Sequence, residues 1–170
     1  MRTIFLVPVA AFVVALSLSE PGGPAGSPPP KGARLDHAAQ ALVDEGRSAE
    51  DVRAALLDLL DEAIAAAPAA GLGGEWPEKA SRARERIATR SPVDPEARRF
   101  LEESWREATG KAWAMPSSVA RIEDATALVK RDVGEAATAL RERRAAEGVR
   151  LLLEAVLVVV TPMHAPAPRS

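Results

Sequence analysis

The sequence contains no cysteine and no tyrosine, and aromatic residues make up only 4% of its 170 positions. Without a cysteine, the chain forms no disulfide, carries no lipid on a lipobox thiol and has no thiol nucleophile. Whatever its compartment, we therefore expect the folded chain to be held together by packing and not by covalent cross-links.

Small aliphatic residues take the place of the missing rings. Hydrophobic residues account for 47% of the sequence and are mainly alanine, leucine and valine, while Phe5 and Phe12 lie in an apolar N-terminal run. No stretch alternates polar and apolar residues as a half-buried strand does. Because alanine and leucine favour closely packed helices, the composition predicts an all-α fold.

The charges are nearly balanced, with 24 acidic and 22 basic side chains and a formal net charge of −2. Proteins that bind the phosphate backbone of a nucleic acid need a clear basic excess. We therefore expect no nucleic-acid partner. A small negative charge favours solubility but points to no other class of partner.

Residues 1–19 have the layout of a secretory signal peptide. A basic start at Arg2 precedes an apolar run over 4–18, and Ser17 and Ser19 supply the small side chains expected before a cut at Glu20. This predicts export to the periplasm or the extracellular space. The alternative is an uncleaved anchor, because the run falls just short of the ~17–25 residues that span a bilayer. If this segment stays uncleaved, we expect membrane contact through it alone.

Proline and glycine mark the limits of the folded domain. Residues 20–33 are a Pro/Gly-rich linker, in which repeated prolines oppose helix and strand, and residues 162–170 are a disordered Pro-rich tail. Residues 34–161 are predicted to form a single helical domain.

Within this domain, apolar residues recur at helical spacing over 35–45, 48–67, 77–89 and 94–109. Ser48 with Asp51 matches a capping box, and Asp94 before Pro95 is typical of a helix start. The short connection at Gly46 predicts an antiparallel hairpin of the first two helices. Gly110 is expected to end the fourth helix.

Residues 117–161 form a nearly continuous helical pattern. Its first part is an a/d heptad seam typical of a coiled coil, with Ser117 or Ser118 as N-cap. A second apolar stripe follows Gly148, where we predict either a bend or a break between helices 118–147 and 149–160. The whole is predicted to be an up-and-down bundle of five or six helices. The seam residues are Val119, Ile122, Thr126, Val129, Val133, Ala136 and Leu140.

An aromatic cluster around the entry to the last long helix is the most specific candidate site. It has two interpretations: a core plug that closes one end of the bundle, or a partly exposed recognition patch for a protein partner, because Trp and Arg are favoured at interface centres. The candidate patch consists of Trp76, Arg98, Arg99, Phe100, Trp105, Trp113 and Met115.

Metal and catalytic signals are weak. His37 and Asp44 are seven residues apart, roughly 10 Å along a helix, which is too far for one ion without a third element. His164 lies beside Met163 in the tail, and Asp58, Asp61 and Glu62 fit a solvated helix face. We expect no metal site, no cofactor and no catalytic residue.

The last apolar helix ends in Val160, Thr161 and Pro162, after an export signal, a Pro-rich spacer and Ala/Arg/Glu-rich helices. In this organisation the chain resembles bacterial periplasmic heavy-metal sensors and small helical periplasmic chaperones. There, a helix often runs into a Leu-Thr-Pro motif followed by Glu-Gln. Here Met163 and His164 follow instead, and no binding residue carries over. The resemblance implies a periplasmic stress or metal-response accessory.

Three functional hypotheses follow. The first is an exported, non-enzymatic helical binding or scaffold protein that binds a protein partner, or itself through the heptad seam. The second is the stress or metal-response accessory, either chaperone-like or sensor-like. The third is an enzyme acting through paired carboxylates, although no pair stands out among the 24 acidic residues. We favour the first hypothesis.

Overall fold

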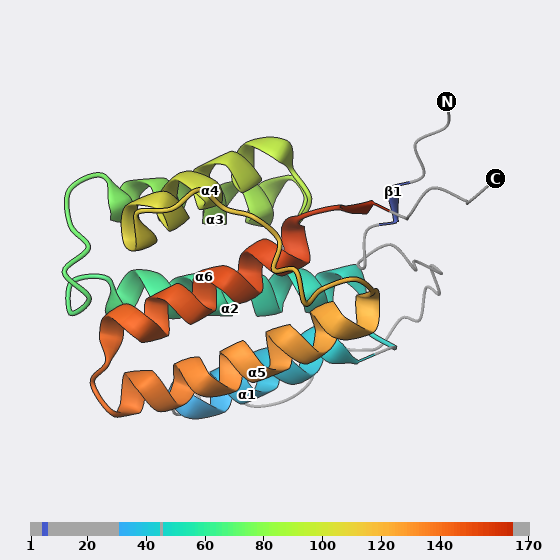
Figure 1. Cartoon of the computed structure of the whole chain (residues 1–170), viewed down its shortest axis with the longest axis horizontal. Coiled ribbons are helices and arrows are strands. Elements are labelled where there is room, and N and C mark those ends of the chain that lie inside the picture. The colour runs from blue at the N-terminus through green and yellow to red at the C-terminus, as the bar shows by residue number, and fades with distance from the viewer. Residues whose placement is uncertain (1–4, 7–30, 45, 165–170) are drawn as a thin grey trace, which may run out of the picture.

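The structure is a computed structural model that describes residues 5–6, 31–44 and 46–164 (Figure 1). It contains six helices and a two-residue strand pairing in this part of the chain. The prediction of an all-α helical bundle is confirmed. Apart from residues 5–6, the predicted signal peptide lies outside the described residues, as do most of the 20–33 linker and the end of the tail.

Six helices form three layers of two, as Figure 1 shows. The central layer consists of α2 (Ala49–Ala66) and α6 (Ala145–Val160). On one side lie α1 (Lys31–Val43) and α5 (Ile122–Arg141), and on the other side lie α3 (Trp76–Thr89) and α4 (Pro95–Thr109). Each central helix packs on the other and on both outer layers.

The sequence of α6 explains its central position. Twelve of its 16 residues are buried, including all residues from Ala155 to Val160. A helix that is apolar on every side must be surrounded by other helices. The outer helices instead bury one face each, as in α3, where Ala80, Ala83 and Ile87 point inward.

The predicted helix starts at Ser48 and Asp94 are confirmed. The Ser48 hydroxyl accepts the Asp51 amide at 3.1 Å, and the Asp51 carboxylate accepts the Ser48 amide at 2.9 Å. Asp94 accepts the Glu96 amide at 3.3 Å. Gly110 ends α4 with a φ of 72°, a left-handed conformation that glycine adopts without a Cβ clash.

The predicted start of the fifth helix was wrong. It begins at Ile122, and neither Ser117 nor Ser118 caps it. Instead, the Asp124 carboxylate accepts the backbone amides of Ala120 at 3.1 Å and Arg121 at 2.9 Å. The start of α5 is therefore capped by a carboxylate in its own first turn, and not by a serine that precedes the helix.

The predicted break at Gly148 was also wrong, because the chain turns at 142–144 and Gly148 lies inside α6. At the turn, the Arg144 amide donates to the Ala139 carbonyl at 2.8 Å, and Arg143 has a φ of 60°. This is the left-handed helix end that usually requires glycine. Gly148 serves a different purpose, since Leu140 of α5 packs directly on its Cα.

The middle of the heptad seam is covered within the single chain. Val129, Val133 and Ala136 are buried, while Ile122 is exposed. The neighbours of α5 are α6 and α1, which cover the buried part of this face. The middle of the seam is thus part of the core, and its start at Ile122 lies at the surface.

Both ends of the predicted domain differ slightly from expectation. α1 begins at Lys31, within the predicted linker, because the first turn of a helix tolerates residues such as glycine that weaken its interior. The tail residues Met163–His164 (β2) pair antiparallel with Phe5–Leu6 (β1), a pairing that the sequence did not predict.

Candidate functional site

The structure divides the predicted aromatic patch among three places. Trp76 belongs to the core: its side chain is 1% exposed, and its indole Nε1 donates to the Ser104 carbonyl of α4 at 2.9 Å. This bond ties the start of α3 to the middle of α4. The prediction that Trp76 lines an exposed patch was therefore wrong, and for this residue the core interpretation holds.

Phe100 lies on a second side of α4. It is partly buried, and the guanidinium groups of Arg99 and Arg82 lie 5.2 Å and 6.0 Å from its ring centroid. Phe100 and Trp105 are five positions apart, which is about 140° around an α-helix. The ring of Phe100 is therefore directed away from Trp105 and toward α3.

Trp105 and Trp113 form the third place, which we call the tryptophan surface, and Met115 lies two residues after Trp113. Trp105 comes from α4, whereas Trp113 and Met115 come from the irregular 110–121 segment. All three are partly exposed and pack against the core. The two indole rings meet edge to face, with centroids 5.2 Å apart and an interplanar angle of 83°, a favoured aromatic geometry.

The indole Nε1 of Trp113 has no acceptor among the described residues, although it is buried. A buried donor without an acceptor costs about 1–3 kcal/mol. The ring is therefore held by packing on Trp105 and the core, and not by a hydrogen bond to the bundle.

The charges of α4 and of the segment that follows it are unevenly paired. Three acidic residues of α4 are each engaged by a basic residue, whereas Arg106 and Lys111 have no side-chain partner in the described part of the chain. The two unpaired positive charges therefore adjoin Trp105 and Trp113 in the sequence. The pairs are Arg98 with Glu102 at 3.4 Å, Arg99 with Glu103 at 3.8 Å, and Lys79 with Glu107.

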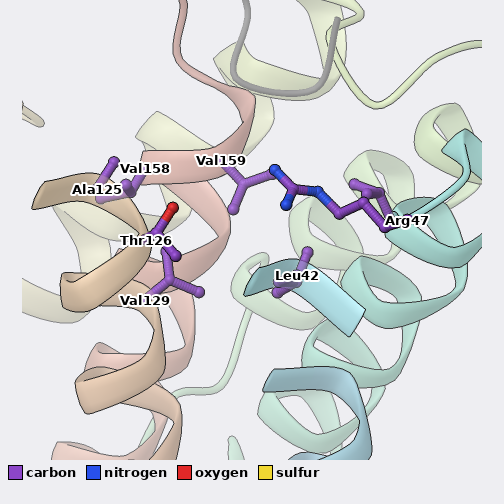
Figure 2. A pocket seen from close by; sticks show the side chains of 8 residues that line it. Leu42, Arg47, Ala125, Thr126, Val129, Val158 and Val159 are labelled. Carbon is purple, nitrogen blue, oxygen red and sulfur yellow. The ribbon is translucent and has the colours of Figure 1, made fainter. Parts of the chain in front are cut away.

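A small pocket opens between the ends of α1, α5 and α6 (Figure 2). It encloses about 330 Å³ of space between atoms, part of it open to solvent. Figure 2 shows the Arg47 side chain extending across its mouth toward Val159, with Leu42 beneath. The lining is otherwise aliphatic except for Thr126. It contains no acid, base or nucleophile arranged for chemistry.

A wider groove runs between α1 and α2 and includes His37, Asp44 and Asp58. Its volume is about 810 Å³, which includes space open to solvent. Asp51 also lines it but is engaged in the capping box with Ser48. In the described residues, no three histidine or carboxylate side chains come close enough to hold a metal ion.

Sequence reasoning missed two features. The unpaired state of Arg106 and Lys111 depends on which acids are paired by other helices, and no local signal reveals it. Asp132 is one of two fully buried polar residues described here. Asp132 lies seven residues after the buried Ala125 and therefore on the same side of α5. The helical spacing of the sequence could thus have predicted that it is buried.

Within the described residues, no helix combines the length and apolarity needed to cross a bilayer. No protein family, curated protein or solved structure compared with this chain matches it. The site is therefore interpreted from its own residues.

Proposed function

We propose that this chain is an exported, non-enzymatic helical protein that binds a protein partner through the tryptophan surface. The observation that carries the proposal is the partly exposed edge-to-face pair of Trp105 and Trp113. Paired aromatic rings at a surface are the usual anchors of protein interfaces. Because Val129, Val133 and Ala136 in the middle of the heptad seam are buried, the proposal places the partner here and not on α5.

The rest of the described surface supports a single specific site. Ile122, at 38% exposure, is the one large hydrophobic side chain classed as exposed among the described residues. A chaperone that holds unfolded clients needs a broad apolar surface. The geometry therefore favours recognition of a defined partner over general capture of unfolded chains.

The proposed partner presents an apolar side chain surrounded by acidic residues. The apolar side chain would pack against Trp105 and Trp113, and the acidic groups would face Arg106 and Lys111. Opposite charges at the rim of an interface chiefly raise the association rate and set orientation. Raising the salt concentration is therefore expected to slow association more than it speeds dissociation.

The export part of the proposal rests on the pattern of residues 1–19. Its test is N-terminal sequencing of the chain recovered from the cells that produce it. We expect the mature chain to begin at Glu20. A chain that begins at Met1 and sediments with membranes would instead indicate an uncleaved anchor.

The binding part is tested first by photo-crosslinking. A benzophenone amino acid replaces Trp105 in one variant and Asp36 in another, and both are irradiated in the producing cells. Asp36 is exposed on α1, in the opposite outer layer of the bundle, so it serves as a control for chance contacts. We expect a discrete crosslinked protein only from position 105.

The crosslinked partner is then purified and its affinity is measured by calorimetry. Trp105→Ala and Trp113→Ala are each expected to weaken binding about 30-fold, the equivalent of ~2 kcal/mol for an interface anchor. Phe100→Ala is the matched control, because it removes an aromatic ring from another side of α4. If all three variants bind like the wild type, the tryptophan surface is not the binding site.

A further inference from the structure

Asp132 is an unusual residue for the centre of a helix-helix contact. Its side chain is 0% exposed and lies on α5, which packs against α6 and α1. Aspartate is almost never fully buried unless it is well paired. Here the pairing is incomplete, because Oδ2 has no hydrogen-bond partner in the described residues.

Among the described residues, Arg131 is the cation that pairs with Asp132, and it is poorly placed to hold the charge of the carboxylate. Arg131 donates to Oδ1 from Nε at 3.1 Å and from a terminal nitrogen at 2.8 Å, but the Arg131 side chain is 58% exposed. Its guanidinium remains in solvent while the carboxylate is in the protein interior. An ion pair with one member in water recovers little of the free energy lost when the other member is buried.

The groups around Asp132 also favour its neutral form. Glu154 of α6 is 14% exposed and paired with Arg150 at 2.7 Å, and Glu135 lies one turn further along α5. On α1, Asp36 lines a groove toward Lys130 and Gly134. Burial raises the pKa of Asp132, Arg131 opposes this, and the negative charges of Glu154 and Glu135 raise the pKa further.

We propose that Asp132 is a proton-operated latch between α5 and α6. When the carboxylate takes up a proton from solvent, no charge remains buried at this contact and the helices pack tightly. When the proton is released, the contact carries an incompletely paired anion and α5 separates from the bundle more readily. The chain is then most tightly closed at acidic pH.

The direction of the effect follows from linkage. A group whose folded-state pKa exceeds its unfolded value stabilises the fold at low pH, and this stability is lost as the pH rises through the folded value. For Asp132 the loss lies above its ordinary value of 3.8. An ordinary salt-bridged carboxylate does the opposite, so the two effects are separable by pH.

The test is urea unfolding of the full chain between pH 4 and pH 8, for the wild type, Asp132→Asn and Glu123→Gln. A raised folded-state pKa makes the unfolding constant rise with pH, by about tenfold for each unit of difference from the unfolded value. We expect the rise in the wild type and in Glu123→Gln to exceed the rise in Asp132→Asn by at least about threefold. Glu123 is the matched control, since it is an exposed carboxylate in the first turn of the same helix and is not among the groups that shift the pKa of Asp132.

Two readouts keep the test decisive if Asp132→Asn changes stability at every pH. The first is the pH slope itself, because every other ionisable group is common to both chains. The second is hydrogen exchange of the α5 amides in the wild type, corrected for intrinsic rates, which should show more protection at pH 4 than at pH 8. Equal pH slopes, or an Asp132 carboxyl that titrates below pH 4 by NMR, would overturn the latch.

Discussion

Adding one methyl group at Gly148 tests a close approach between α5 and α6. A Cβ built there would lie 2.6 Å from Cδ2 and 2.7 Å from Cγ of Leu140. Nonbonded carbon atoms attract best at about 3.5–4.0 Å, so Gly148→Ala forces Leu140 to move by roughly 1 Å. Leu140 is only half-buried and can yield, but it then loses its contact with α6.

Two effects of opposite sign determine the result. Alanine in a helix interior is more favourable than glycine by about 1 kcal/mol. Overpacking a close contact costs about 1–3 kcal/mol, and here the atoms that clash belong to the base of a leucine and not only its tip. We therefore expect Gly148→Ala to lower the free energy of unfolding by a net ~1 kcal/mol.

Gly134→Ala is the matched control. Gly134 lies inside α5, is exposed, and a Cβ there would meet no heavy atom within 4 Å. Only the helix propensity term acts, so the expected change is a gain of about 0.5–1 kcal/mol. Urea unfolding followed by circular dichroism and tryptophan fluorescence measures both variants. An equal gain in both would refute the close approach of Leu140 to Gly148.

Three further predictions concern single groups. Arg143→Gly should stabilise the fold by about 0.5–1 kcal/mol in the same unfolding assay, because it relieves a left-handed φ of 60°; a loss would show that the arginine side chain matters more than the strain. Trp76→Phe should cost about 1–3 kcal/mol, since it leaves the Ser104 carbonyl without its donor; a neutral result would mean that water replaces the indole. The hydrogen bond from Arg86 lowers the pKa of Asp94, so its contribution is present above pH 3.8 and lost as the pH falls through the lowered value; acid titrations should show this loss in the wild type and less of it in Asp94→Asn.

Helix ends that depend on nearby residues were predictable. Ser48 and Asp94 were identified as caps because a capping side chain acts on amides two or three positions away. Gly110 was identified as a helix end because its left-handed conformation suits glycine. The turn at 142–144 was not predicted, because the residue in the left-handed conformation there is Arg143 and not the glycine that usually marks such a helix end.

The site was less predictable because it depends on the packing of distant segments. Tryptophan favours both cores and interfaces, and only the arrangement of α3 against α4 places Trp76 inside and leaves Trp105 partly exposed. The heptad spacing in α5 correctly predicted that Val129 and Val133 lie on a buried face. It did not predict which helices cover that face. Periodicity predicts that a face is buried, and it cannot tell an internal neighbour from a second copy of the chain.

The central position of α6 has a consequence for how this chain acquires its structure during synthesis. The helix that contacts α2, α4 and α5 is the last of the six to leave the ribosome. Until residues 145–160 are available, α2 is the only helix of the central layer, and α4 and α5 lack the helix that links them to it. Many of the final contacts join distant segments, which slows folding. A chain cut short before α6 therefore loses part of the middle of the bundle and not its edge, so a premature stop just before residue 145 should be as damaging as one near the start.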